Sequence, residues 1–177
     1  MNTTGELGRI NSAHQSFNDI ILLDQTQFPR PWSTKDWENL NWDNHQLFNW
    51  KQGGVTIAFA LFGLVAADDV AHLLKICVHS GQRGSGLAQL FWQECQEQIT
   101  ACGAKSVYLE VELPNQRAIG FYKKLGFVSL RTIKRYYSDG TDALTMQMII
   151  WVGNALKLLF RFDFVTNVTC FRFRWWG

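Results

Sequence analysis

The stretch GQRGSGLA, residues 81–88, combines three glycines with an arginine, directly after an apolar run and directly before a segment of helical periodicity. Backbone N–H groups at the start of a helix carry a partial positive charge, and small residues there let an anion approach them closely. The sequence therefore predicts a phosphate-binding loop. The residues around the glycines decide which phosphate-bearing ligand fits it.

Two nucleotide-binding loops do not fit this stretch. Gly81 and Gly86 have the spacing of a Walker A loop, which binds nucleoside triphosphates. Leu87 and Ala88, however, stand where that loop needs a lysine and a hydroxyl residue that binds Mg²⁺. Gly84 and Gly86 match the start of a dinucleotide-binding fingerprint, but a glutamine replaces its third glycine. We therefore expect the loop to hold phosphates without hydrolysing them and without a metal ion.

The segments around the loop predict an α/β domain with a mixed sheet. Ser33 and Asp36 are spaced as in a helical capping box, and Trp32 and Trp37 occupy the positions of a hydrophobic staple. Gly53–Gly54 predicts a hairpin turn. Helices are expected at 17–28, from Ser33, from the glycine loop to Gly103 and at 115–125, and strands at 46–51, 55–65, 71–78, 106–112, 127–136 and 143–150.

The second half of the loop resembles the pyrophosphate-binding loop of the GNAT acetyltransferases. RGSGLA, residues 83–88, fits their pattern Q/R-x-x-G-x-G/A at each position. NQRAIGFYKKLGF, residues 115–127, is similar to the family's stretch N-x-x-A-I/L-x-L/F-Y-x-x-x-G-F. The resemblance implies the GNAT fold, a mixed, mostly antiparallel central sheet flanked by helices, and acetyl-CoA as co-substrate.

Further motifs resemble one branch of that family, the RimI-type ribosomal-protein-alanine N-acetyltransferases. They are LEV at 109–111, FPRPWS at 28–33 with Arg30 and Pro31 inserted, RYY at 135–137 and DA at 142–143. The resemblance covers about residues 17–150. The chain departs from it before the glycines, where HSGQ replaces the usual Asp-Pro.

The resemblance implies direct transfer of an acetyl group to an amine, with Glu110 as general base and Tyr122 as general acid. Apolar and polar residues alternate over 106–112, so Glu112 shares the face of Glu110 and is the alternative base. A tyrosine of ordinary pKa, about 10, stays protonated at neutral pH and can donate a proton to the leaving thiolate. An α-amine has a pKa of about 8 and a lysine one of about 10.4, so the α-amine is more easily deprotonated by the base near neutral pH. This favours an N-terminal amine as acceptor.

The same resemblance assigns the residues that bind acetyl-CoA. The backbone of 76–78 is expected to pair with the pantetheine arm like an added strand. The residues expected to bind acetyl-CoA are Ile76, Cys77, Val78, Arg83, Gly84, Ser85, Gly86, Leu87, Ala88, Gln89 and Asn115. Asn115 is alternatively the N-cap of its helix. Cys77 is not expected to form an acyl-enzyme, because no neighbouring cation is assured that would activate it. His72 and His79 flank this strand and are expected to be ordinary surface or core residues.

The acceptor implied by the RimI-type resemblance is the N-terminal alanine of a ribosomal protein. Trp32–Ser33 and Tyr136–Tyr137 are expected to contact it, since aromatic side chains hold an extended peptide at low entropic cost. Two alternatives remain: a GNAT enzyme that acetylates a small-molecule amine such as a polyamine, and a non-catalytic acyl-CoA-binding module. Glu110 and Tyr122 argue against the module, and the LEV and RYY motifs argue against the small-molecule enzyme.

Composition and charge limit the partners and the cellular location that we expect for this protein. A net charge of +2 over 177 residues gives no case for a nucleic-acid or membrane partner. The first residues lack the layout of a secretory signal, and the four cysteines show no metal-binding spacing, so we expect a cytoplasmic protein without a metal site. We expect one acetyltransferase domain over 1–150. The remaining residues, 151–177, form a C-terminal extension whose role the sequence leaves open.

Overall fold

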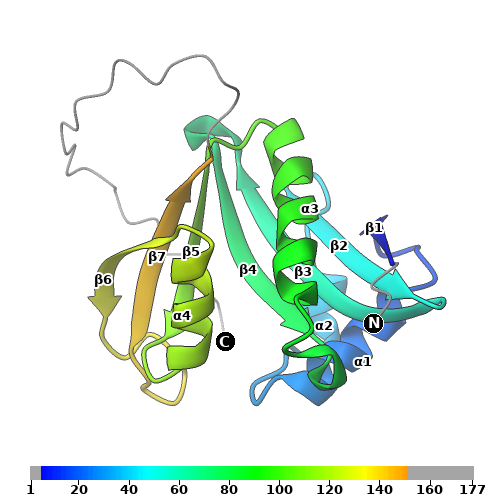
Figure 1. The fold of residues 1–177 in the computed structure, drawn as a ribbon, viewed down its shortest axis with the longest axis horizontal. Coiled ribbons are helices and arrows are strands. Elements are labelled where there is room, and N and C mark those ends of the chain that lie inside the picture. Colours follow the sequence, from blue (N-terminus) through cyan, green and yellow to red (C-terminus); the bar gives the residue numbers. More distant parts are fainter. Residues whose placement is uncertain (1–4, 151–177) are drawn as a thin grey trace.

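The computed structural model describes residues 5–150, which form one seven-stranded sheet with helices on both faces (Figure 1). The strands follow the order β1-β2-β3-β4-β5-β7-β6, and every neighbouring pair is antiparallel except β4 and β5. The strands are β1 (Glu6–Ile10), β2 (His45–Gln52), β3 (Val55–Val65), β4 (Val70–Val78), β5 (Ser106–Glu112), β6 (Val128–Ile133) and β7 (Ala143–Ile149). The helices are α1 (Phe17–Gln27), α2 (Thr34–Glu38), α3 (Leu87–Ala101) and α4 (Gln116–Lys124). The predicted fold class, a mixed and mostly antiparallel sheet flanked by helices, is confirmed.

The helix start predicted at Ser33 and the hairpin predicted at Gly53–Gly54 are both present in the structure. The Ser33 hydroxyl accepts a hydrogen bond from the Asp36 backbone N–H at 3.2 Å, and the Asp36 carboxylate accepts one from the Ser33 N–H at 2.8 Å. The rings of Trp32 and Trp37 pack with their centroids 5.3 Å apart. Gly53–Gly54 joins β2 to β3 with φ of +57° and +80°, a conformation that favours glycine.

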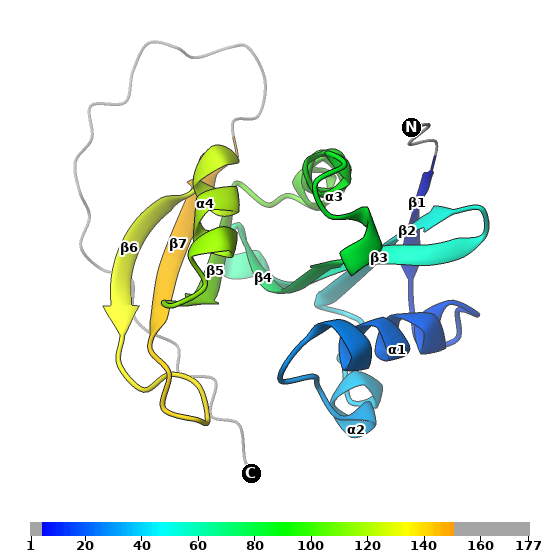
Figure 2. The ribbon, with the colours of Figure 1, turned by 60° about the horizontal axis from the view of Figure 1, so that its bottom comes forward.

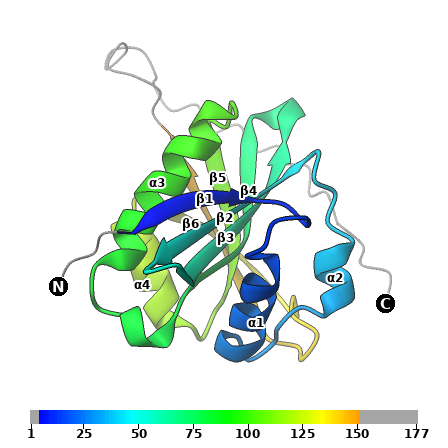
Figure 3. The ribbon, with the colours of Figure 1, turned by 90° about the vertical axis from the view of Figure 1, so that its right-hand side faces the viewer.

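Two strands differ from the sequence prediction. β1 was not expected, because its five residues are too few to show a clear alternation of apolar and polar side chains. It forms by antiparallel pairing with β2 at the edge of the sheet, as Figure 3 shows. β6 ends at Ile133, three residues before the predicted end of that strand. The backbone turns there because Arg135 has a φ of +50° and its N–H donates to Asp142 Oδ1 at 2.9 Å.

The sheet separates two hydrophobic clusters, with α1 and α2 on one side and α3 and α4 on the other (Figure 2). The α3/α4 cluster includes Phe91 and Trp92 of α3, Val107, Leu109 and Val111 of β5, and Tyr122 of α4. The α1/α2 cluster includes Ile20 of α1, Trp37 of α2, Phe59 of β3 and Cys77 of β4. Val107, Leu109 and Val111 thus place one face of β5 against the α3/α4 cluster, and Cys77 of β4 packs on the α1/α2 side.

A buried ion pair fastens α1 to β4. The Lys75 ammonium donates to the Asp24 carboxylate, and the side chains of both residues are almost completely buried. The same carboxylate accepts from the Trp37 indole N–H and from the Trp32 backbone N–H, each at 2.9 Å. Burial lowers the pKa of Lys75, and the neighbouring Asp24 carboxylate opposes that change. The pair therefore holds the segment between α1 and α2 against the sheet.

Replacing Lys75 by alanine is expected to lower the free energy of unfolding by about 3–5 kcal/mol, because Asp24 would remain buried without its counter-charge. A thermal melt followed by circular dichroism should show a fall in Tm of roughly 10 °C. The double variant Lys75→Met/Asp24→Asn removes both charges and should recover most of the loss. A double variant no more stable than Lys75→Ala would contradict this account of the pair.

The described chain ends one residue after β7, at Ile150. The C-terminal extension expected over 151–177 lies outside the described residues. Within residues 5–150, the helices are too short or too polar to cross a bilayer.

Candidate active site

β4 and β5 lie side by side only at their beginning. Their register pairs residues 70–72 with residues 106–108, and the two strands then separate (Figure 1). A bulge in β4 at Leu74, which has no partner in β3, lies close to the point of separation. Beyond this point, the β4 edge facing β5 has no strand partner among the described residues, so its backbone groups are open to a ligand that adds as a strand. Residues 76–78, predicted to bind the pantetheine arm, lie on this edge.

The glycine loop lies between the end of β4 and the start of α3. Gly84 and Gly86 have φ of +80° and +86°, a region that favours glycine. The backbone N–H groups of Gly84, Gly86 and Ala88 have no hydrogen-bond partner within the described residues, whereas that of Leu87 donates to the Ser85 hydroxyl at 3.3 Å. Free N–H groups at the start of a fifteen-residue helix form a site that suits an anion such as a pyrophosphate.

The other residues predicted to bind CoA near this loop differ in what they contact. Arg83 donates to the Gln27 side-chain oxygen at 3.4 Å, which places its guanidinium beside the last residue of α1. Gln89 lies in the first turn of α3 and is exposed. The Asn115 side-chain oxygen accepts from the Ala118 N–H at 3.1 Å, so Asn115 is the N-cap of α4. The capping alternative for Asn115 is therefore present in the structure.

Glu110 lies on the face of β5 opposite the α3/α4 cluster, where it meets a histidine. Its side chain is 12% exposed, and its Oε2 lies 2.6 Å from Nε2 of His72. The His72 ring packs edge-on against Tyr108, with centroids 5.4 Å apart. His72 is the last β4 residue paired with β5, so the His72–Glu110 contact lies where the gap between the strands opens. The sequence predicts an ordinary surface or core histidine at position 72, because its contact with Glu110 depends on a strand register that no local pattern specifies.

Tyr122 lies on the other face of β5, in the α3/α4 cluster. Its ring is buried and packs against Phe127 with centroids 5.5 Å apart. The hydroxyl has no hydrogen-bond partner among the described residues, and burial holds its pKa well above the ordinary value of tyrosine. The hydroxyl is therefore protonated throughout the neutral range. Glu110 and Tyr122 do not contact each other, because they lie on opposite faces of the same strand.

Arg30 links three parts of the chain beside Glu110. Its guanidinium donates to the carboxylates of Glu112, at the end of β5, and of Asp139, between β6 and β7. It also lies over the Tyr137 ring, 5.0 Å from the ring centroid. Burial, followed by nearby charges that include Glu110 and Glu112, raises the pKa of Tyr137. The alternative base, Glu112, is therefore bound to a cation, whereas the predicted base, Glu110, contacts His72.

Five other residues are candidates for the chemistry or for contact with the acceptor: Cys77, Trp32, Ser33, Tyr136 and Tyr137. Burial raises the pKa of the Cys77 thiol to about 12, so an acyl-cysteine route has almost no thiolate to start from at neutral pH. Trp32 packs against Trp37, and Ser33 caps α2. Tyr136 and Tyr137 pack with perpendicular rings, and Tyr136 is 45% exposed. Of the predicted acceptor contacts, Ser33 and Tyr136 are exposed, whereas Trp32 and Tyr137 are only partly exposed.

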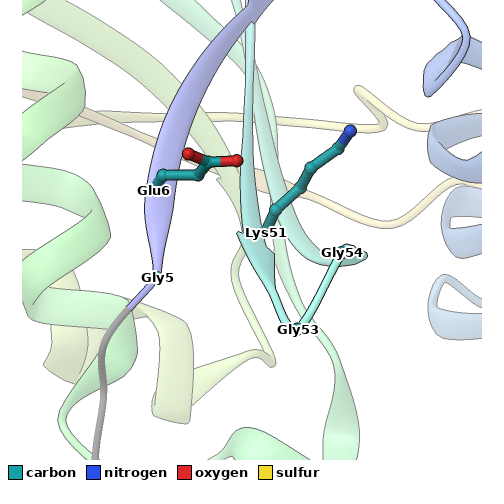
Figure 4. Close-up of a pocket in the computed structure, with 5 residues that line it drawn as sticks. All are labelled: Gly5, Glu6, Lys51, Gly53 and Gly54. Carbon is teal, nitrogen blue, oxygen red and sulfur yellow. The ribbon is translucent and has the colours of Figure 1, made fainter.

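A shallow pocket lies elsewhere, at the β2–β3 turn (Figure 4). It is lined by Gly5, Glu6, Lys51, Gly53 and Gly54. In the sheet order, β1 and β2 are separated from β5 by two further strands. The pocket includes neither the glycine loop nor any residue of β4 or β5, so we place no step of the chemistry there.

Comparison with known proteins is consistent with this geometry. Residues 17–127 match the family model described as the acetyltransferase (GNAT) family. An N-alpha-acetyltransferase of Sulfurisphaera tokodaii is 37% identical over 76 residues, which cover 42% of this chain and 46% of that protein. The match thus spans about half the length of that relative.

Three further matches, one to a protein sequence and two to solved structures, cover most of the length of the matched chain. The [ribosomal protein bS18]-alanine N-acetyltransferase of Escherichia coli is 30% identical over 136 residues, which cover 71% of this chain and 90% of that protein. The crystal structure of the ribosomal-protein-S18-alanine N-acetyltransferase from Escherichia coli superposes with a TM-score of 0.76 at 25% identity, covering 89% of this chain and 100% of that one. Arabidopsis thaliana NAA60 in complex with acetyl-CoA superposes with a TM-score of 0.72 at 18% identity, covering 83% and 99% of the two chains, and shows a shared fold.

Proposed function

This chain belongs to the GNAT acetyltransferase family, and from that premise we propose that it transfers the acetyl group of acetyl-CoA to the α-amine of a protein N-terminus. One observation carries the proposal: a single gap between β4 and β5 has a loop with free backbone N–H groups at its end and the Glu110 carboxylate at its opening. A non-catalytic module would have no need of that carboxylate.

The residues present fit acetyl-CoA. The free N–H groups of Gly84, Gly86 and Ala88 would hold its pyrophosphate, and the open edge of β4 at 76–78 would pair with its pantetheine arm. Acetyl-CoA supplies a thioester, whose C–S bond breaks as the new C–N bond forms. The β4 edge also offers backbone N–H groups to the carbonyl oxygen of that thioester.

The remaining steps are proton transfers by this chain's side chains. Glu110 takes a proton from the acceptor ammonium, directly or through a water molecule, and leaves a neutral amine that can attack. The His72 ring, in contact with the same carboxylate, orients Glu110 and offers the proton a route onward. Tyr122, on the opposite face of β5, donates a proton to the departing sulfur, and the second proton that the nitrogen loses as the amide forms replaces the one that Tyr122 gave. Base and acid on opposite faces suit a reaction in which the nucleophile enters on one side and the leaving group departs on the other.

For the acceptor, we propose the N-terminal alanine of a ribosomal protein. The support is the Escherichia coli relative, whose name gives ribosomal protein bS18 as its substrate, at 30% identity over 71% of this chain. An α-amine, with a pKa of about 8, is also easier for a carboxylate base to deprotonate than a lysine amine. The exposed aromatic surface of Tyr136 beside the gap suits an extended peptide.

The test is an acceptor panel. The protein is incubated with acetyl-CoA and, separately, with peptides beginning Ala-Arg-Tyr and Ala-Gln-Tyr, the same peptides with blocked α-amines, free lysine and a polyamine. CoA release is followed, and mass spectrometry locates the acetyl group. Release with only the unblocked peptides supports the proposal. Turnover of the polyamine alone would refute the peptide acceptor, and tight CoA binding with no turnover of any amine would refute the enzyme.

Replacing Gly86 by valine is expected to raise the KM for acetyl-CoA by about tenfold or more, with a smaller effect on kcat. A β-branched residue strongly disfavours the φ of +86°, so the loop must turn its N–H groups away from the phosphates. Steady-state kinetics and calorimetric titration with CoA would measure the change. Gly103→Val is the matched control, since Gly103 has a φ of +95° at the other end of α3 and no atom within 4 Å of an added Cβ. An equal rise in KM in both variants would show that general strain, not the loop, is responsible.

A further inference from the structure

Arg30 lies in the loop between α1 and α2, where this chain departs from the family motif that residues 28–33 resemble. The motif resembled by residues 28–33 has no counterpart for Arg30 and Pro31. In the structure, this added arginine leaves the loop between α1 and α2 and reaches across to β5 and to the loop between β6 and β7. It does so on the face of the sheet that carries Glu110.

The partners of Arg30 form a recognition site for a cation. Two carboxylates, Glu112 and Asp139, and the face of the Tyr137 ring surround its guanidinium. This is the set of groups that binds an arginine side chain most strongly, by charge-assisted hydrogen bonds and stacking. The side chains of Arg30, Glu112 and Asp139 are 33%, 32% and 48% exposed, so the cluster lies at the surface, within reach of a bound peptide.

The cluster lies at a defined distance from the proposed base. Glu112 follows Glu110 by two residues on the same face of β5, which places the two positions roughly 7 Å apart along the strand. An acceptor whose α-amine is at Glu110 has its second residue about one residue length further on. A peptide that runs along β5 from Glu110 toward Glu112 would place the side chain of that second residue beside the cluster of Glu112, Tyr137 and Asp139.

We propose that Arg30 is a specificity-determining residue. Its own side chain fills the acidic and aromatic subsite that would otherwise bind the side chain of the acceptor's second residue. The proposal rests on the proposed function, since it requires an N-terminal peptide as acceptor. With the subsite filled by Arg30, the enzyme selects acceptors with an uncharged second residue over acceptors with arginine there. Without Arg30, two carboxylates are left open and the preference turns toward a basic residue.

The experiment compares kcat/KM for peptides beginning Ala-Gln-Tyr, Ala-Arg-Tyr and Ala-Glu-Tyr in the wild type and in Arg30→Ala. The wild type is expected to prefer the glutamine peptide over the arginine peptide by about tenfold. In Arg30→Ala the arginine peptide should gain roughly tenfold or more, the value of one charge-assisted pair, while the glutamine peptide changes little. Adding Glu112→Gln to Arg30→Ala should remove most of that gain.

Two further variants serve as controls. Arg9→Ala removes an exposed arginine from β1, far from the gap, and should leave all three rates unchanged. Arg30→Gln keeps most of the side chain without its charge. It replaces Arg30→Ala in the experiment if a thermal melt shows that Arg30→Ala does not fold. An equal loss on all three peptides would overturn the proposal and leave Arg30 as a latch between loops. A wild type that acetylates only small amines would refute the proposed function itself, and the subsite with it.

Discussion

Replacing Glu110 by glutamine is expected to lower kcat by about 10²–10⁴-fold, the usual contribution of a general base. Glutamine keeps the shape of the side chain and a hydrogen bond to His72, but its amide cannot take a proton from the acceptor. Because Glu110 lies on the face of β5 away from α3 and α4, the KM for acetyl-CoA should change little. Steady-state kinetics with an alanine peptide, at several pH values, would measure both constants.

The pH dependence separates this role from a structural one. The defect of Glu110→Gln should shrink as the pH rises above about 8, because an α-amine that is already neutral needs less help from a base. A defect caused by a distorted site would not shrink in this way. Glu112→Gln is the matched control, since that carboxylate is held by Arg30, and it should lower kcat only a few-fold. Equal losses in the two variants would contradict the assignment of the base to Glu110.

The parts of the site that could be predicted from sequence are those encoded over a few consecutive residues. The glycine loop is one, because the groups that we propose to bind the phosphates are backbone N–H groups whose positions follow from glycine and a helix start. The alternation in β5 is another, since Val107, Leu109 and Val111 are buried and leave the face of Glu110 to polar residues. The capping box at Ser33 is a third. For these features, the local stereochemistry determines the geometry without contacts to residues far away in the sequence.

The parts that could not be predicted depend on residues far apart in sequence. His72 and Glu110 are 38 positions apart, and Arg30 lies 82 positions from Glu112 and 109 from Asp139. These contacts follow from the parallel register of β4 with β5 and from where two loops meet. Neither is visible in a periodic pattern. The same holds for β1, which forms because β2 offers it an edge.

Replacing Tyr122 by phenylalanine is expected to lower kcat by about 10²–10⁴-fold, while leaving the fold and the KM for acetyl-CoA nearly unchanged. The ring supplies the packing in the α3/α4 cluster, and phenylalanine keeps the ring. The hydroxyl makes no hydrogen bond within the described residues, so its removal leaves no partner unsatisfied and should shift the Tm by little. A large loss of turnover in a protein of unchanged stability would thus assign the hydroxyl a chemical role.

The raised pKa of Tyr122 gives this prediction a second test. Burial favours the neutral phenol, so the group stays protonated up to and beyond the ordinary tyrosine pKa of about 10. The alkaline side of the wild-type kcat profile should therefore show no loss from Tyr122 below about pH 10. Tyr136→Phe is the matched control, because it removes a phenol from the half-exposed acceptor side and should change the KM for the peptide more than kcat. Unchanged turnover in Tyr122→Phe would mean that the leaving thiolate takes its proton from elsewhere, and would remove the one side chain that the α4 face contributes to the reaction.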